Sequence, residues 1–212
     1  MKAHRIPRLG VTGGIGSGKS TATAFLAELG AAVVSADELV HHLLEEQAII
    51  SRVERHFGGG VFEDQQIDRP ALAQVVFNDA GELVWLESLL HPHVKRLIDA
   101  WAGEQEARRP RPPLLVAEVP LLFETDMADV FDYVLLVTAP EAARRKRLSA
   151  KVTGAEFSRR AARQLPEADK AARSDFVVEN VGGREGLKRY VGETYATILA
   201  KRGRRGVLPP AR

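Results

Sequence analysis

Cysteine is absent from this 212-residue sequence, which excludes a disulfide framework, a thiolate metal site and a cysteine nucleophile. The sequence also has no apolar run of about 18 residues, the length that a membrane-spanning helix needs. No segment has the pattern of a secretory signal. These absences predict a cytoplasmic protein with no membrane partner. The length and the hydrophobic content of 45% suit one α/β domain that carries an insertion or a lid.

Charge is nearly balanced overall, at +2, but it is unevenly distributed. The segment from Arg144 to Arg173 holds ten basic and three acidic residues, residues 201–212 add five basic ones, and the remainder has an acidic excess of ten. A nucleic-acid-binding protein would spread basic residues over one face, so no nucleic-acid partner is expected. One basic segment favours a lid that closes over a polyphosphate, and a solvated basic helix face is the alternative.

The most informative stretch runs from Arg8 to Thr21 and reads RLGVTGGIGSGKST. Gly13, followed after four residues by Gly18-Lys19-Ser20, fits the P-loop spacing G-x-x-x-x-G-K-[ST]. Glycines let successive N–H groups converge on phosphate oxygens, and the next helix directs its positive dipole end at the same anion. This spacing predicts that Lys19 reaches the β- and γ-phosphates and that Ser20 ligates Mg²⁺.

Three alternative patterns fit this stretch less well. A plain turn between strand and helix does not require Lys-Ser at the start of the helix. The dinucleotide-binding pattern G-x-G-x-x-G fails, because its last position, counted from Gly14 and Gly16, is Lys19. A regulatory GTPase would need the guanine-reading motif N-K-x-D, and neither Asn78 nor Asn180 is followed by lysine.

Short apolar runs that alternate with helical patterns predict the core of the fold. Strands are expected at 9–11, 31–35, 114–117, 133–137 and 176–178, and helices at 21–29, at 140–150 and from 183 onward. The apolar side chains of the last helix that should face the core are Leu187, Tyr190, Val191, Tyr195 and Ile198. The first strand, helix and strand should form a parallel pair with a right-handed crossover. We therefore expect an α/β protein with the three-layer core of the P-loop NTPases and a five-stranded parallel sheet.

The 75 residues from 38 to 112 are too many for a simple crossover and predict a helical insertion. Its helices are expected at 38–45, 48–57, 69–77 and 81–90, with a new helix starting at Pro92. The predicted domains are a nucleotide-binding core (8–37, 113–150 and 174–200), a substrate-binding insertion (38–112), a lid (151–173) and a disordered basic tail (201–212).

Two carboxylates follow predicted strands, and each has two interpretations. Carboxyl ends of parallel strands meet at one edge of a sheet, so Asp37 and Glu118 should both face the P-loop. Asp37 suits a general base that accepts the proton of an attacking hydroxyl, or else the cap of the helix that follows. Glu118 suits a Walker-B acid that holds Mg²⁺, or else a strand end that faces solvent.

Two histidines flank a proline in the predicted insertion, in the order His91-Pro92-His93. A histidine before a proline at the first helical position is often only part of a helix cap, and contact with a substrate is the functional alternative. Metal binding by the pair is disfavoured, because no thiolate or third ligand accompanies it.

The motifs together resemble one family, the dephospho-CoA kinases. The resemblance is carried by LGVTGGIGSGKST, VVSAD, LLHP, VPLLFE and RQLPEADKAARSDFVVEN, and it extends from Arg8 to about Leu199. It implies that ATP phosphorylates the ribose 3′-hydroxyl of dephospho-CoA, the last step of coenzyme A synthesis, with Mg²⁺ as cofactor. We expect a monomer or a weak homo-oligomer.

The resemblance also implies roles for individual residues. Asp37, Lys19 and Arg147 would be catalytic, with Asp37 as the base. The ATP site would comprise Gly14, Ile15, Gly16, Ser17, Gly18, Lys19, Ser20, Thr21 and Asn180. The acceptor site would comprise Thr12, Asp37, His91, Pro92, Leu121, Leu122 and Glu124. Ser20 and Glu118 would hold the metal.

Two departures from the family pattern bear on these roles. Ser35 stands where the family has the first Asp of D-A-D, so a supporting carboxylate is lost beside Asp37. Lys151 stands at an arginine position of a lid motif that is two residues shorter, and lysine cannot make the forked contact with phosphate that arginine makes. Arg147 is therefore the favoured phosphate ligand. Another nucleoside or nucleotide kinase of the same fold is the alternative function.

Overall fold

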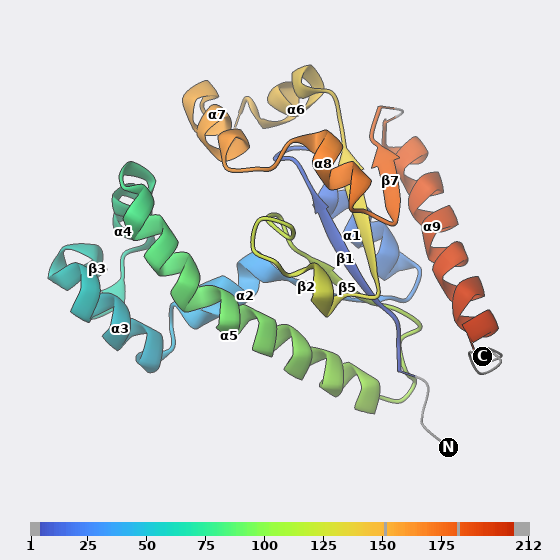
Figure 1. The fold of residues 1–212 in the computed structure, drawn as a ribbon, viewed down its shortest axis with the longest axis horizontal. Helices are drawn as coiled ribbons and strands as arrows, with labels where there is room; N and C mark the ends of the chain where they lie inside the picture. Colours follow the sequence, from blue (N-terminus) through green and yellow to red (C-terminus); the bar gives the residue numbers. More distant parts are fainter. Residues whose placement is uncertain (1–4, 151, 182, 206–212) are drawn as a thin grey trace, which may run out of the picture. The chain divides into compact units, whose positions relative to one another are not determined.

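The computed structural model describes residues 5–150, 152–181 and 183–205 (Figure 1). Lys151, the lid residue in question, lies outside the described residues, as does the tail after residue 205. The sheet consists of β1 (Arg8–Gly13), β2 (Ala32–Ser35), β5 (Leu115–Glu118), β6 (Tyr133–Thr138) and β7 (Phe176–Glu179). Each of these strands overlaps one of the apolar runs found in the sequence, with bounds that differ by at most two residues.

The five strands form one parallel sheet in the order β2-β5-β1-β6-β7. The central strand β1 pairs with β5 through Leu9 opposite Val116, and with β6 through Val11 opposite Leu135. Parallel pairing aligns the strand ends, so the residues that follow β1, β5, β6 and β7 lie along one edge. The predicted five-stranded parallel sheet is confirmed.

One face of the sheet is covered by α1 (Lys19–Glu28) and α9 (Gly183–Arg205) (Figure 1). Side chains alternate between the two faces of a strand, so Leu9 and Val11 of β1 point into this layer. They share a core with Phe25 and Leu26 of α1 and with Val191 of α9, and all five are no more than 1% exposed. On the other face, Gly10 leaves space for Leu122 and Phe131.

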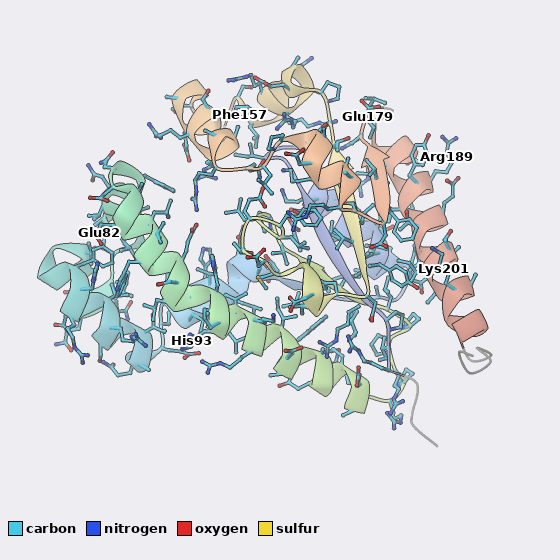
Figure 2. All side chains as sticks on the ribbon, viewed as in Figure 1. Glu82, His93, Phe157, Glu179, Arg189 and Lys201 are labelled. Carbon is cyan, nitrogen blue, oxygen red and sulfur yellow. The ribbon has the colours of Figure 1, made fainter. Side chains whose placement is uncertain are left out.

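The helices after β6 belong to the predicted lid and to its approach. They are α6 (Glu141–Leu148), α7 (Gly154–Ala162) and α8 (Glu167–Ala172). Phe157 of α7, labelled in Figure 2, is 3% exposed. The guanidinium carbon of Arg145 lies 4.4 Å from the centre of its ring. This cation–π contact joins α7 to α6.

Residues Ser35–Ala100 form a second compact unit, whose limits the sequence placed at 38 and 112. The unit holds α2 (Ala36–Leu43), α3 (Gln47–Phe57), the 3₁₀ turn η1 (Gly58–Val61), α4 (Arg69–Asn78) and most of α5 (Ala80–Ala107). It also holds a short hairpin, β3 (Phe62–Glu63) and β4 (Gln66–Ile67), which the sequence analysis did not predict.

Pro92 does not start a new helix, contrary to the prediction, but lies inside the 28-residue helix α5. Proline has no N–H and crowds the preceding turn, which weakens the main-chain bonding of nearby carbonyls. In the next position, Nδ1 of His93 lies 3.0 Å from the carbonyl oxygen of Leu89, four residues earlier in the same helix. A carbonyl only accepts, so Nδ1 carries the proton, and His93, labelled in Figure 2, has a structural partner within its own helix.

The last helix is longer than predicted, because α9 continues through residues 201–205, which the sequence analysis assigned to a disordered tail. Its core stripe also differs at one position. Leu187, Val191 and Ile198 are buried as expected, but Tyr190 is 44% exposed.

No helix within the described residues is both long enough and apolar enough to cross a membrane.

Candidate active site

The loop between β1 and α1 has the geometry of an anion-binding turn. It tightens at a backbone hydrogen bond from the Ser17 N–H to the Gly14 carbonyl, 3.1 Å long. Gly18 is the N-cap of α1 in a left-handed conformation, and no side chain caps the helix. The first N–H groups of α1 therefore have no capping side chain, as a helix that receives a phosphate requires.

At two positions of the loop there is no space for a side chain, so only glycine fits. A β-carbon on Gly13 would lie 2.1 Å from the carbonyl oxygen of Val137, and one on Gly18 would lie 2.4 Å from Nδ2 of Asn180. Both residues also have a positive φ, 149° and 107°, which side-chain-bearing residues rarely adopt. The loop thus requires glycine for close backbone approach as well as for conformation.

Lys19 begins α1 and is 9% exposed. Its ammonium donates to the carbonyl oxygens of Gly13 and Gly14, at 3.2 and 3.3 Å. The side chain therefore folds back over the loop rather than extending into solvent. A cation in this position lies beside the N–H groups of the loop, and the contact of Lys19 with the β- and γ-phosphates stays a prediction.

Glu118 ends β5 and reaches across to α1. Its Oε1 accepts a hydrogen bond from the Ser20 hydroxyl at 2.9 Å, and its Oε2 accepts one from Thr23 at 3.3 Å. The alternative of a carboxylate that simply faces solvent is therefore wrong. Thr23 was not singled out in the sequence, although it follows Ser20 by three residues and so shares its helix face.

The Ser20 and Glu118 oxygens fit a magnesium ion, because both are hard donors and lie together beside the loop. Within the described ranges, no three His, Cys, Asp or Glu side chains gather into a metal-binding group. Mg²⁺ commonly keeps several waters and takes other ligands from phosphate oxygens, so two protein donors are sufficient for such a site.

The guanidinium of Arg147, in α6, contacts backbone carbonyl oxygens of the loop. The guanidinium donates to the carbonyl oxygens of Gly16 and Ser17, both at 3.2 Å, and to that of Asn180 at 3.0 Å. Asn180 is 6% exposed and donates through Nδ2 to the same Ser17 carbonyl at 2.8 Å. Both residues therefore hold the loop in place at the Ser17 carbonyl.

Two further residues approach the loop and were missed in the sequence. Arg144 donates through Nε to the carbonyl of Ala139 at 3.0 Å, and its guanidinium lies where a side chain on Gly14 would go. Gln164 donates to the Gly13 carbonyl at 3.4 Å. Arg144 opens the basic segment and Gln164 lies in the motif that begins at Arg163, but only the folded chain shows that both contact the loop.

The remaining predicted acceptor residues of this unit are Thr12, in β1, and three residues of the segment after β5. Thr12 donates from its hydroxyl to the carbonyl of Pro120 at 3.2 Å. Leu122 is fully buried, at 0% exposure, whereas Leu121 is half-buried. Glu124 accepts the N–H of Leu165 at 2.8 Å. This segment is thus anchored both to β1 and to the start of α8.

Asp37 lies in the second unit and is exposed. The cap of α2 is Ser35, whose hydroxyl accepts the N–H of Glu38 at 3.4 Å, so the interpretation of Asp37 as the helix cap is wrong. This contact also gives a role to the serine that replaces the family's aspartate. His91, half-buried, and Pro92, exposed, belong to the same unit.

The sheet order and the loop with Lys19, Ser20 and Glu118 place this chain in the class of P-loop kinases. A shikimate kinase from Acinetobacter baumannii shares that fold, with a TM-score of 0.50 over 93% of this chain and 96% of that one, at 14% identity. The family model described as Dephospho-CoA kinase matches residues 8–185. The chain belongs to the dephospho-CoA kinase family.

Relatives of known name and structure agree with this membership. A dephospho-CoA kinase of Protochlamydia amoebophila is 38% identical over 92% of this chain and 97% of its own length. One of Anaeromyxobacter dehalogenans is 39% identical over 93% of this chain and 94% of its own. A Thermus thermophilus protein of known crystal structure matches with a TM-score of 0.78 at 36% identity, over 91% of this chain and 97% of that one.

The contact between Ser20 and Glu118 generates a first prediction. Glu118→Gln should lower kcat roughly 100-fold and raise the Mg²⁺ concentration needed for half-maximal activity, because the charge beside the metal position is lost. Initial rates over a Mg²⁺ titration measure both effects. Glu179→Gln is the matched control, since Glu179 ends β7 and is exposed. Equal Mg²⁺ dependence in the two variants would contradict a metal-side role for Glu118.

A second prediction concerns Gly18, for which Gly30 is a matched control. Both have a positive φ, but a β-carbon on Gly30 would meet nothing within 4 Å. Gly30→Ala should therefore cost only about 1 kcal/mol of stability. Gly18→Ala should in addition lower kcat/KM for ATP at least roughly tenfold, because it displaces the Asn180 amide from the loop. Thermal unfolding and steady-state kinetics separate the two effects, and similar kcat/KM values would refute the packing argument.

Proposed function

We propose that this chain transfers the γ-phosphoryl group of ATP to the ribose 3′-hydroxyl of dephospho-CoA, giving coenzyme A and ADP. The observation that carries the proposal is the hydrogen bond between Ser20 and Glu118, at 2.9 Å, beside a phosphate loop with a buried lysine. That arrangement is suited to phosphoryl transfer, in which positioning and charge neutralisation supply most of the catalysis.

Each part of the nucleotide site has a proposed role. The N–H groups from Gly14 to Thr21 bind the β- and γ-phosphates, and Lys19 neutralises charge on their oxygens. Ser20 and Glu118 hold Mg²⁺, directly or through water. When bound, Mg²⁺ would withdraw charge from the β- and γ-phosphates. Asn180 and Arg147 keep the loop in its binding conformation, which their hydrogen bonds to the Ser17 carbonyl support.

Arg147, in the helix α6 that precedes the predicted lid, is also proposed to bind the phosphate of ATP. Its guanidinium has five N–H donors, and its backbone contacts involve only Nη1 and Nη2. Charge that develops on the transferring group is stabilised by a cation already in place. A conservative change to lysine would lose the forked geometry at this position.

Asp37 is the proposed general base. The acceptor hydroxyl oxygen attacks the γ-phosphorus, the bond from that phosphorus to the β–γ bridging oxygen breaks, and the hydroxyl proton passes to the Asp37 carboxylate. Two observations support this role: Asp37 is exposed, and the capping function that would otherwise account for it is performed by Ser35.

The proposed acceptor residues are found in both units. In the nucleotide-binding unit the proposed acceptor residues are Thr12, Leu121, Leu122 and Glu124, with fully buried Leu122 acting through the packing of its segment. In the unit of residues 35–100 they are Asp37, His91 and Pro92. A long helical insertion suits an acceptor with an extended arm.

A direct assay tests the function. With Mg-ATP, ADP release should be fastest with dephospho-CoA, and the product should carry phosphate on the ribose 3′-oxygen. Adenosine and AMP serve as comparison acceptors. A higher kcat/KM for either of them would favour the alternative, a nucleoside or nucleotide kinase.

A substitution tests the base. Asp37→Asn should lower kcat roughly 10²- to 10⁴-fold while the KM for ATP stays nearly constant, because only proton acceptance is removed. Glu38→Gln is the control, since Glu38 is an exposed carboxylate in the same first turn of α2. If Asp37→Asn lowers only the melting temperature, as a residue that merely stabilises the helix start would, the assignment is wrong.

A further inference from the structure

The guanidinium of Arg144, in α6, lies against the phosphate loop. A β-carbon on Gly14 would be only 2.6 Å from Nη1 of this arginine, so the guanidinium fills the space beside that glycine. Its Nε donates to the carbonyl of Ala139 at 3.0 Å, which restrains the orientation of the group. The side chain is half-buried, but Nη1 and Nη2 are accessible to solvent and have no hydrogen-bond partner among the described residues. Their N–H groups are therefore available to a ligand.

The positive charge of Arg144 has no ion-pair partner within the described ranges. Glu141, the acid of its own helix, pairs instead with Arg145, whose Nε lies 2.7 Å from Oε1 of the carboxylate. Lys170, in α8, pairs with Glu124 at 3.9 Å. Burial lowers the pKa of Lys170, two glutamates oppose this shift, and the charge of Arg144 adds to it. An anionic ligand at Arg144 would relieve this repulsion between cations.

Arg144 and Lys19 approach the loop at the same residue. The Lys19 ammonium donates to the Gly14 carbonyl at 3.3 Å, and the Arg144 guanidinium lies where a side chain on Gly14 would go. The Arg144 backbone is also close, because a β-carbon on Gly16 would lie 3.0 Å from its carbonyl oxygen. The lysine of a P-loop reaches the β- and γ-phosphates, so a cation at the same residue suits the same phosphates. A guanidinium adds the two-point contact that an ammonium lacks.

A purely structural role accounts less well for Arg144. Its guanidinium carbon lies 5.8 Å from the centre of the Phe157 ring, so the side chain could serve to attach α7. Arg145 is closer to the same ring, at 4.4 Å, and already provides that contact. Arg147 shows what a structural arginine of this helix looks like, because both of its terminal nitrogens donate to backbone carbonyls. Arg144 makes no such contact through its terminal nitrogens.

We infer that Arg144 is a further catalytic residue, which binds the γ-phosphate of ATP and stabilises the charge that develops on the transferring phosphoryl group. Nη1 and Nη2 donate to the phosphate oxygens beside Lys19. Arg144 forms no covalent bond and keeps its proton, while the acceptor oxygen attacks the γ-phosphorus and the bond to the β–γ bridging oxygen breaks. The inference rests on the ATP-binding half of the proposed function.

The test compares Arg144→Met with Lys146→Met in the full chain. Lys146 is an exposed cation of the same helix and controls for the loss of one charge. Arg144→Met should lower kcat about 100-fold. Calorimetry should show that it raises the Kd of the β,γ-imido analogue of ATP about tenfold and that of ADP less than about twofold, because only the γ-phosphate contact is lost. Lys146→Met should leave all three constants unchanged.

Arg144→Lys keeps the charge and provides a second variant if Arg144→Met does not fold. It should bind the triphosphate analogue with a Kd between those of the wild type and Arg144→Met, and its kcat should be at least about tenfold below the wild type, because the forked contact is lost. Equal weakening of ADP and of the triphosphate analogue would indicate an effect on the loop alone and would overturn the inference. An unchanged kcat with a lower melting temperature would also overturn it.

The nucleotide-binding measurements need no acceptor, so they separate this inference from the proposed function. If the wild-type protein turns over another acceptor better than dephospho-CoA, the proposed function fails, whereas a selective loss of triphosphate binding still supports Arg144. If the wild-type protein prefers dephospho-CoA and Arg144→Met binds both nucleotides as the wild type does, only the inference fails.

Discussion

Close backbone approach in the loop between β1 and α1 is the constraint on which the site depends. Gly13 and Gly18 have no room for a side chain, because the Val137 carbonyl and the Asn180 amide occupy that space. Val137 lies near the end of β6 and Asn180 directly follows β7. The loop is therefore shaped by two strands that are distant from it in sequence. The parallel sheet brings them together, since its strand ends share one edge. A loop fixed in this way can bind a phosphate without first having to become ordered.

The charged side chains around this loop have different partners. The carboxylate of Glu118 accepts from the Ser20 hydroxyl of α1, whereas the guanidinium of Arg147 donates to backbone carbonyls of the loop. The carboxylate suits a metal ion, and the guanidinium suits a transferring phosphate. The contact of Arg145 with buried Phe157 packs part of the basic segment against an apolar side chain. Membership in the dephospho-CoA kinase family gives this arrangement its substrate.

The segment after β5 links the nucleotide site to the acceptor residue Glu124. Its beginning hydrogen-bonds to β1, and its end, Glu124, is held by Leu165 and Lys170 from the region of α8. A rearrangement of residues 164–170 would therefore affect contacts with both the Gly13 carbonyl and the Glu124 carboxylate. In the proposed function this coupling would let the lid region respond to both substrates, which is how lids commonly complete a catalytic site.

The phosphate loop, the five strands and the acids at their ends could be predicted from the sequence alone. Spacing and apolar runs encode those features locally, and the resemblance of several motifs supplied the family. The sequence analysis misjudged Pro92 and Tyr190, and it did not predict the hairpin at Asp64 and Gln65, whose left-handed conformations carry no glycine signal.

The folded chain was needed to show that Ser35 rather than Asp37 caps α2, because either side chain suits a helix start. The fold also brought Glu118 to Ser20, and it paired Lys170 with Glu124. No local pattern specifies these last two contacts, because residues that distant in sequence meet only once the sheet has assembled.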